Sequence, residues 1–231
     1  MKRLVPLCLV VALLLVTVAV SSPTDVNAQG AGFVSSLLNK MERNRQTLKS
    51  LRASVDMVKY NAQIGDEDKY KGVVLYVPAV GRNAYVRVDW SFPQKETLAV
   101  SDGQFTLFRP RLNVAYKGRA GTGRGKSSAA FEFMNMSKQQ LSARYDVQDM
   151  GQETLWGGVS TQHVKLVPKG GASFKWAEAW VDGGGMPVQT KVVEKNDDST
   201  TVRLTNLQRN ADFSLDEFIL KLASGVKIIP A

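Results

Sequence analysis

From Leu51 onward apolar and polar residues alternate along the chain, and this period of two is the feature that most constrains the fold. Alternation sends successive side chains to opposite faces of an extended backbone, so each run predicts a strand with one face toward a core. The runs are short and bounded by turn signals, such as Ser91-Phe92-Pro93 and Asp102-Gly103. An Asp-Gly pair between apolar runs is typical of a tight hairpin, because Gly supplies the positive φ that the turn needs. The pattern therefore predicts an antiparallel meander.

A sheet of about ten or eleven strands is expected, and sheets of that size curl or close. The predicted fold class is mainly β (α+β): an incomplete antiparallel β-barrel wrapped around an N-terminal helix, with short lid helices. A last apolar segment covers 226–229. The predicted strands are 51–58, 71–77, 84–90, 97–101, 105–109, 112–117, 145–150, 158–168, 174–181, 187–194 and 200–207.

Helical spacing appears in two places. Residues 33–49 carry apolar side chains three and four positions apart, which predicts an amphipathic helix that packs on the sheet. Residues 129–136 and 137–144 predict two short helical turns rich in Phe and Met. These turns either form a movable lid across the mouth of the barrel or plug one end of it permanently, and the pattern favours neither.

The first segment is expected to be removed before folding. Lys2 and Arg3 precede an uncharged apolar run, and Val26-Asn27-Ala28 is a small-residue cleavage pattern. This predicts a secretory signal peptide over 1–28, a single domain over 29–231, and a periplasmic location. The rival interpretation is a permanent membrane anchor, for which the run is short. Cys8 is the one cysteine of the chain, so the mature part has no disulfide or thiol chemistry.

Enzymatic chemistry finds little support in the residue types. His163 is the one histidine and lies in a predicted strand, where it points to solvent or bonds a neighbour. A nucleophile needs a base beside it, and transition-metal sites usually need clustered His or Cys. We therefore expect no enzyme, no cofactor and no metal. The Gly-rich basic stretch 118–128 ends in Gly-Lys-Ser but lies between hairpins, so we interpret it as a mobile basic loop.

The formal net charge of +9 favours anionic partners such as lipid headgroups, cell-wall polymers or acidic proteins, or serves solubility alone. Nucleic acid is not expected as a partner of an exported chain. The positive signal is hydrophobic, because many strands carry apolar residues on one face and a barrel can enclose an apolar ligand.

Three stretches together resemble the LolA-type periplasmic lipoprotein carriers. They are the helix leading into a strand at 37–53, the Ser-Asp-Gly hairpin within 96–110, and the ending within 210–226, where Asn210-Ala211-Asp212-Phe213 precedes Phe218 and Gly225-Val226. The resemblance covers nearly the whole mature chain in the same order. It implies an incomplete barrel with lid helices and a cavity for the acyl chains of lipoproteins. It also implies a transporter in the inner membrane and a receptor in the outer membrane as partners. We further expect transient membrane contact and a monomer.

One departure concerns the closure of the lid. Members of the family typically have an Arg before a Pro, where this chain has Val77 before Pro78. Arg82 or Arg87 could serve as the latch instead. A divergent carrier of another lipid, or a lipid-binding sensor of envelope state with the same fold, are the alternative functions.

Strand parity gives the candidate site. If the parity of a strand is wrong by one residue, all the side chains assigned to the cavity from that strand lie on the other face of the sheet. The expected lid residues are Phe131, Phe133 and Met136, and the expected cavity lining is Val73, Leu75, Val77, Val86, Val88, Trp90, Leu98 and Val100.

Overall fold

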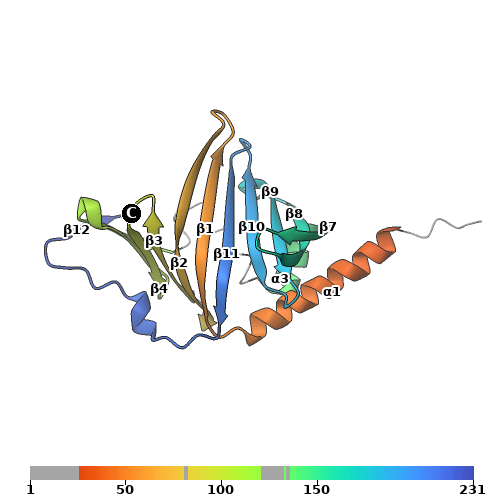
Figure 1. The fold of residues 1–231 in the computed structure, drawn as a ribbon, viewed down its shortest axis with the longest axis horizontal. Helices are drawn as coiled ribbons and strands as arrows, with labels where there is room; N and C mark the ends of the chain where they lie inside the picture. The colour runs from red at the N-terminus through yellow and green to blue at the C-terminus, as the bar shows by residue number, and fades with distance from the viewer. Residues whose placement is uncertain (1–25, 81–82, 121–132, 134–135) are drawn as a thin grey trace, which may run out of the picture.

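The computed structural model describes residues 26–80, 83–120, 133 and 136–231, and Figure 1 shows them as one large curved sheet with a long N-terminal helix at its lower right. The described helices and turns are α1 (Val26–Thr47), η1 (Pro110–Leu112), α3 (Lys138–Arg144) and η2 (Leu215–Phe218). The strands are β1 (Leu51–Asn61), β2 (Asp66–Val80), β3 (Asn83–Phe92), β4 (Glu96–Ser101), β5 (Gln104–Arg109), β6 (Val114–Arg119), β7 (Tyr145–Leu155), β8 (Val159–Pro168), β9 (Phe174–Asp182), β10 (Pro187–Glu194), β11 (Ser199–Arg209) and β12 (Lys227–Pro230).

All twelve described strands belong to one sheet in the order β12-β6-β5-β4-β3-β2-β1-β11-β10-β9-β8-β7. Most neighbours are also neighbours in sequence, as a meander of hairpins requires. The sheet is not closed, since β12 and β7 are its two outer strands. The predicted incomplete antiparallel barrel is thereby confirmed, with one exception: β12 pairs with β6 in parallel, through Ile228 opposite Ala115.

The sheet has an inner face, which we define by Leu51, Val55 and Met57 of β1. These residues are at most 3% exposed, whereas Arg52 on the same strand is exposed. Registry extends the inner face to both sides, because Met57 lies opposite Tyr70 of β2 and Val202 of β11. The alternate residues form the outer face.

Helix α1 covers the β7–β10 part of the inner face. It begins at Val26, earlier than the predicted start at Phe33, and its apolar side chains include Leu38 and Met41. They pack in one cluster with Val164 of β8 and Ala179 of β9. No helix in the described ranges is both long and apolar enough to cross a membrane.

Short helix α3 is fixed at its start by Ser137, whose side chain accepts a hydrogen bond from the backbone N–H of Gln140. The side-chain carbonyl of Gln140 in turn accepts one from the backbone N–H of Ser137. This reciprocal cap satisfies two backbone donors that the first turn leaves unpaired. Lys138 donates its backbone N–H to Glu42 at 3.1 Å and its ammonium to Asn39 at 2.9 Å, so α3 is tied to α1.

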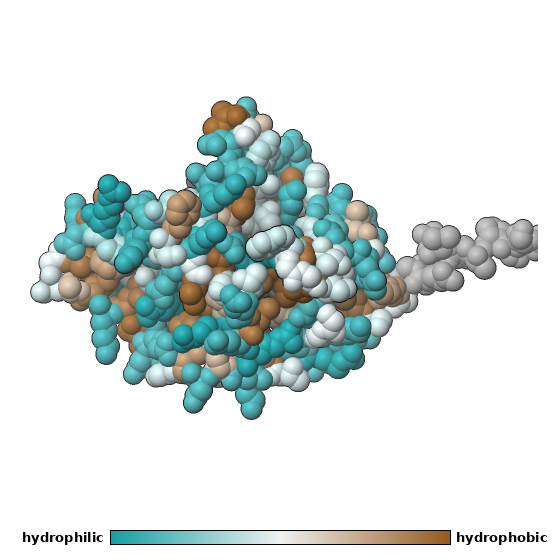
Figure 2. Space-filling view, in the orientation of Figure 1, coloured by the Kyte–Doolittle hydropathy of each residue, from teal (hydrophilic) through white to brown (hydrophobic). Residues whose placement is uncertain are grey.

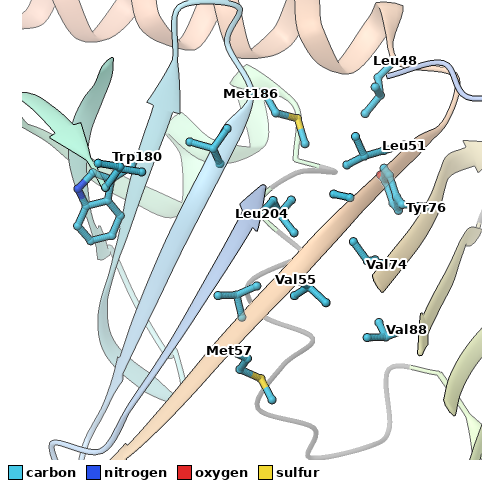
Figure 3. Packing of buried hydrophobic residues seen from close by; sticks show 14 residues of the cluster. Leu48, Leu51, Val55, Met57, Val74, Tyr76, Val88, Trp180, Met186 and Leu204 are labelled. Carbon is cyan, nitrogen blue, oxygen red and sulfur yellow. The ribbon is translucent and has the colours of Figure 1, made fainter. Parts of the chain in front are cut away.

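A second cluster of buried residues lies on the inner face at the centre of the sheet, and Figure 3 shows it beside the end of α1. Leu51, Val55 and Met57 follow one another along β1, with Val74 of β2 and Val88 of β3 across the sheet. Burial of such side chains is the main favourable contribution to folding. Half-buried residues pack against the margin of the cluster on β3, with Val86 level with Leu51 and Trp90 level with Val55.

The chain after β11 crosses the outer face of β3 and β4 before it reaches the sheet edge as β12, and Figure 1 shows it as a long connection. Phe218 of η2 is 1% exposed and its ring lies 5.7 Å from those of Tyr85 and Phe213. Arg87 donates a hydrogen bond to the carbonyl of Glu217 at 2.7 Å. We call residues 210–226 the C-terminal strap, because they fasten β12 across the back of the sheet.

The β1–β2 hairpin projects beyond its neighbours in Figure 1, and Figure 2 shows an apolar cap on this otherwise hydrophilic projection. Ile64 in its turn is 72% exposed.

Candidate functional site

The inner face of β3 to β6 is the candidate ligand surface, because its apolar side chains are only half-buried. In contrast, the same face of β1 and β11 is buried almost completely, as at Val55 and Leu204. Half-buried apolar side chains on a curved sheet leave hydrophobic area available to an apolar ligand. The half-buried residues of this surface are Val86, Leu98, Val100, Phe105, Leu107 and Tyr116.

The registry places the predicted β3 and β4 residues on one surface. Val86 lies opposite Val100, and Val88 lies opposite Leu98. Trp90 follows on the same side of β3 and packs against the central cluster. The structure thus brings these five predicted lining residues together on the inner face, and their contact with a ligand stays a prediction.

The parity predicted for β2 was wrong. Val74, not Val73, lies opposite Val88, so the predicted set Val73, Leu75 and Val77 lies on the outer face. Val73 is 41% exposed, and Leu75 is buried. The inner-face residues of β2 that sequence reasoning missed are Tyr70, Gly72, Val74 and Tyr76.

A local irregularity accompanies this face of β2. The pairing of β2 with β3 shifts register between Lys71 and Gly72, and a Cβ at Gly72 would lie 2.4 Å from the carbonyl oxygen of Asp89. A glycine is therefore required for the two backbones to approach at this bulge.

The predicted lid residues that the structure describes pack on the other half of the sheet. Phe133 and Met136 are buried with α1 above the β7–β10 side of the inner face. The Phe133 ring lies 5.7 Å from that of Tyr145 and 6.5 Å from that of Phe174. Phe131 lies outside the described residues.

The predicted latch on the lid is corrected in part. Arg87 lies on the outer face, where it pairs with Asp89 at 2.8 Å and holds the C-terminal strap through Glu217. Its side chain is therefore on the wrong side of the sheet to reach a ligand or a cover on the inner face. Arg82 lies outside the described residues.

Charged and aromatic side chains end the inner face at the end of β1 away from α1. Arg109 of β5 pairs with Glu96 of β4, with 3.0 Å between Nε and Oε1. The rings of Tyr70 and Trp90 meet edge to face at 5.8 Å, and the ammonium of Lys59 lies 4.9 Å from the Tyr70 ring centre. Burial, and then the charge of Asp68, raises the pKa of Tyr70 above its ordinary value. We call Lys59, Tyr70, Trp90, Glu96 and Arg109 the polar rim.

Sequence reasoning missed the polar rim except for Trp90. The available signal was parity: Glu96 and Arg109 continue the alternation of Leu98 and of Leu107, so each charged residue occupies an inner-face position.

His163 lies in β8, as predicted, and is held on the outer face. Its ring is stacked on Trp180 at 4.2 Å, and its two nitrogens lie 3.2 Å from Glu153 and 3.3 Å from Glu178. The same carboxylates accept hydrogen bonds from indole N–H groups, Glu153 from Trp180 and Glu178 from Trp176. Among the described residues, the ring thus contacts two carboxylates and an indole.

A cavity of about 550 Å³ lies between the end of α3 and the loop from Pro168 to Phe174. It is distant in sequence and in the sheet order from the half-buried surface of β3 to β6. Within the part of the chain that the structure describes, no group of His, Cys, Asp and Glu is arranged to hold a metal ion.

The chain was compared with protein families, with curated proteins and with solved structures. The family described as "Outer membrane lipoprotein carrier protein LolA" matches residues 79–221, which is more than half of the chain. This match includes β3 to β6, the outer-face histidine and η2. No curated protein matches the sequence.

Solved structures resemble the fold at low sequence identity. An uncharacterized conserved protein from Thermus thermophilus aligns with a TM-score of 0.55 and 11% identity, over 86% of this chain and 99% of that one. A chain of the Pseudomonas aeruginosa MucA/MucB complex aligns with a TM-score of 0.50 and 13% identity, over 82% of this chain and 61% of that one. These likenesses show a shared fold.

Proposed function

Because the chain belongs to the outer membrane lipoprotein carrier family, LolA, we propose that it is a periplasmic carrier that holds acyl chains of lipoproteins against its inner face. Family membership supports a carrier of lipid or lipoprotein. The observation that carries the proposal is the half-buried apolar surface of β3 to β6, which continues a fully buried core. The proposed activity makes and breaks no covalent bond.

The binding free energy of such a carrier follows from the apolar area of the ligand that is removed from water. Each methylene removed from water contributes roughly 0.8 kcal/mol, so a long acyl chain needs no covalent attachment to be held. Hand-over requires that the net affinity stay limited. An inner face that is already partly covered by its own side chains provides this limit, because the ligand must displace contacts as it binds.

The proposal includes a route. The signal peptide predicted over 1–28 exports the chain, an inner-membrane transporter loads the carrier, and an outer-membrane receptor unloads it. A basic mature chain is suited to brief contact with anionic membrane surfaces on the way. A monomer is sufficient, since the half-buried surface lies within one chain.

A charge placed on the inner face tests the proposal. Leu98→Glu puts a carboxylate among half-buried apolar residues, and Val73→Glu is the matched control on the outer face. We expect Leu98→Glu to abolish co-purification of acylated ligands from the periplasm, measured by native mass spectrometry, and Val73→Glu to retain them. Circular dichroism checks that both variants fold.

Transfer separates carriage from sensing. Purified protein loaded with an acylated lipoprotein should pass it to acceptor membranes that contain the receptor. Stable ligand binding without any transfer would contradict the carrier role and favour a lipid-binding sensor. Absence of acyl ligands from wild-type protein would refute both.

A further inference from the structure

The polar rim sits at one end of the apolar inner face, and this placement has consequences for the ligand. Strand β1 leaves α1 at Leu51, and its inner-face residues become polar only at Lys59, beyond Met57. On β3, where the inner face is only half-buried at its two ends, the apolar residues run from Trp90 at the rim to Val86, roughly 13 Å at about 3.3 Å per residue. An amphiphile lying along this surface would therefore place its polar end at the rim.

The cations of the rim have unused donors. The buried Nε of Arg109 lies 3.0 Å from Glu96 but forms no hydrogen bond, and within the described residues its two Nη atoms form none either. Lys59 contacts the Tyr70 ring, and among the described residues its ammonium has no hydrogen-bond acceptor. A guanidinium presents its N–H groups as a planar fork that fits the oxygens of a carboxylate or phosphate.

The hydroxyl of Tyr70 adds a neutral donor to this set. The phenol is protonated at neutral pH because the ordinary pKa of tyrosine is about 10, and burial, followed by the charges of Asp68 and Glu96, raises this pKa further. Glu96 lies opposite Trp90, whose ring meets that of Tyr70 at 5.8 Å, and Arg109 pairs with Glu96 at 3.0 Å, so these side chains share one neighbourhood. Two carboxylates, Asp68 and Glu96, thus stand against two cations near this phenol. The hydroxyl and the unpaired N–H groups of Arg109 remain as donors, which favours a ligand with anionic oxygens.

We propose that the polar rim binds the anionic headgroup of an amphiphile whose acyl chain lies on the inner face, with Arg109 as its main contact. This inference rests on the proposed function and narrows its ligand class to acyl compounds that end in a phosphate or carboxylate. Glu96 holds the guanidinium in place when the site is empty and competes with the headgroup when it is filled.

Three ligands with the same acyl chain test the proposal in calorimetric titrations below their micelle concentrations: palmitate, 1-palmitoyl lysophosphatidate and 1-monopalmitoylglycerol. Wild-type protein should bind at least one anionic ligand about tenfold more tightly than the neutral one, as a charge-assisted hydrogen bond implies. Preference for palmitate or for lysophosphatidate identifies the carboxylate or the phosphate as the recognised group.

Two substitutions that remove charges of opposite sign make the test specific. Arg109→Gln should remove the preference and leave the affinity for monopalmitoylglycerol within about twofold, while Glu96→Gln should strengthen binding of the anionic ligand. Arg111→Gln is the matched control, because Arg111 carries the same charge nearby but is exposed in η1.

The outcomes are distinguishable. Equal affinity of the wild type for all three ligands would overturn the headgroup site and leave the carrier proposal intact. The same would follow if Arg109→Gln weakened all three equally, or if Arg111→Gln had the same effect as Arg109→Gln. Failure of the wild type to bind any of them would overturn the carrier proposal as well.

Discussion

Removal of the Phe218 side chain should destabilise the whole protein, although the residue lies in a short turn outside the regular sheet. Phe218 is 1% exposed and fills the space between the C-terminal strap and the outer face of β3, in contact with the rings of Tyr85 and Phe213. Phe218→Ala leaves a cavity there, which the hydrogen bond from Arg87 to Glu217 keeps from collapsing.

The magnitude follows from the buried area. A phenylalanine buries roughly 200 Å², which at about 25 cal/mol per Å² corresponds to about 5 kcal/mol for complete burial. Alanine retains part of this contribution, so we expect Phe218→Ala to lower the free energy of unfolding by about 3–4 kcal/mol. That is a large part of the roughly 5–15 kcal/mol typical of a folded domain.

Urea denaturation followed by circular dichroism measures this change. Leu215→Ala is the control, because Leu215 lies in the same turn but is 49% exposed, and we expect it to cost less than about 1 kcal/mol. A loss below about 1 kcal/mol for Phe218→Ala would refute the reasoning. Faster amide exchange confined to Ile228 and Ile229, with unchanged global stability, would show instead that the strap and β12 open as a separate unit.

Two further predictions concern α1 and its contacts. Hydrogen bonds from Arg45 hold the pKa of Glu42 at about 2, below its ordinary 4.5, so their contribution to stability is complete above pH 4.5 and is lost as pH falls toward 2. Glu42→Gln should lower the free energy of unfolding at neutral pH by about 1 kcal/mol and flatten its acid dependence; an unchanged acid profile would contradict this. Gly185→Ala should lower the melting temperature by several degrees, because a Cβ would lie 2.3 Å from the carbonyl oxygen of Lys40 and φ is +86°. Gly183→Ala, in the same turn with open space, should change it little, and equal effects of the two substitutions would exclude the contact with α1 as the cause.

Much of the architecture could be predicted from local patterns. Alternation and turn residues predicted hairpins such as β4–β5 around Asp102-Gly103, and spacing predicted that Leu37, Leu38 and Met41 face a partner surface. Parity also grouped β3 with β4 correctly. These features depend on residues close together in sequence, where the geometry of strands and helices fixes which side chains share a face.

The site was less predictable where the position of a residue depends on contacts with residues that are distant in sequence. Phe133 and Met136 have the apolar character expected of a cover, but which part of the sheet they cover depends on where α1 packs. Arg87 has the chemistry of a latch, yet its partner Glu217 lies in a segment that returns from the end of the chain.

Strand β2 shows most clearly which features follow from the sequence and which depend on the tertiary structure. The sequence alone determined that residues 73–77 form an apolar strand within a curled sheet, but five apolar residues in a row carry no alternation from which to choose a face. Only the tertiary structure decided the choice, because Val74 and Tyr76 meet the inner core while Leu75 is buried on the opposite face, which the C-terminal strap crosses. Where a strand is covered on both faces, as β2 is at Val74 and Leu75, it loses the polar side that would reveal its orientation, so its parity is set by its neighbours in space.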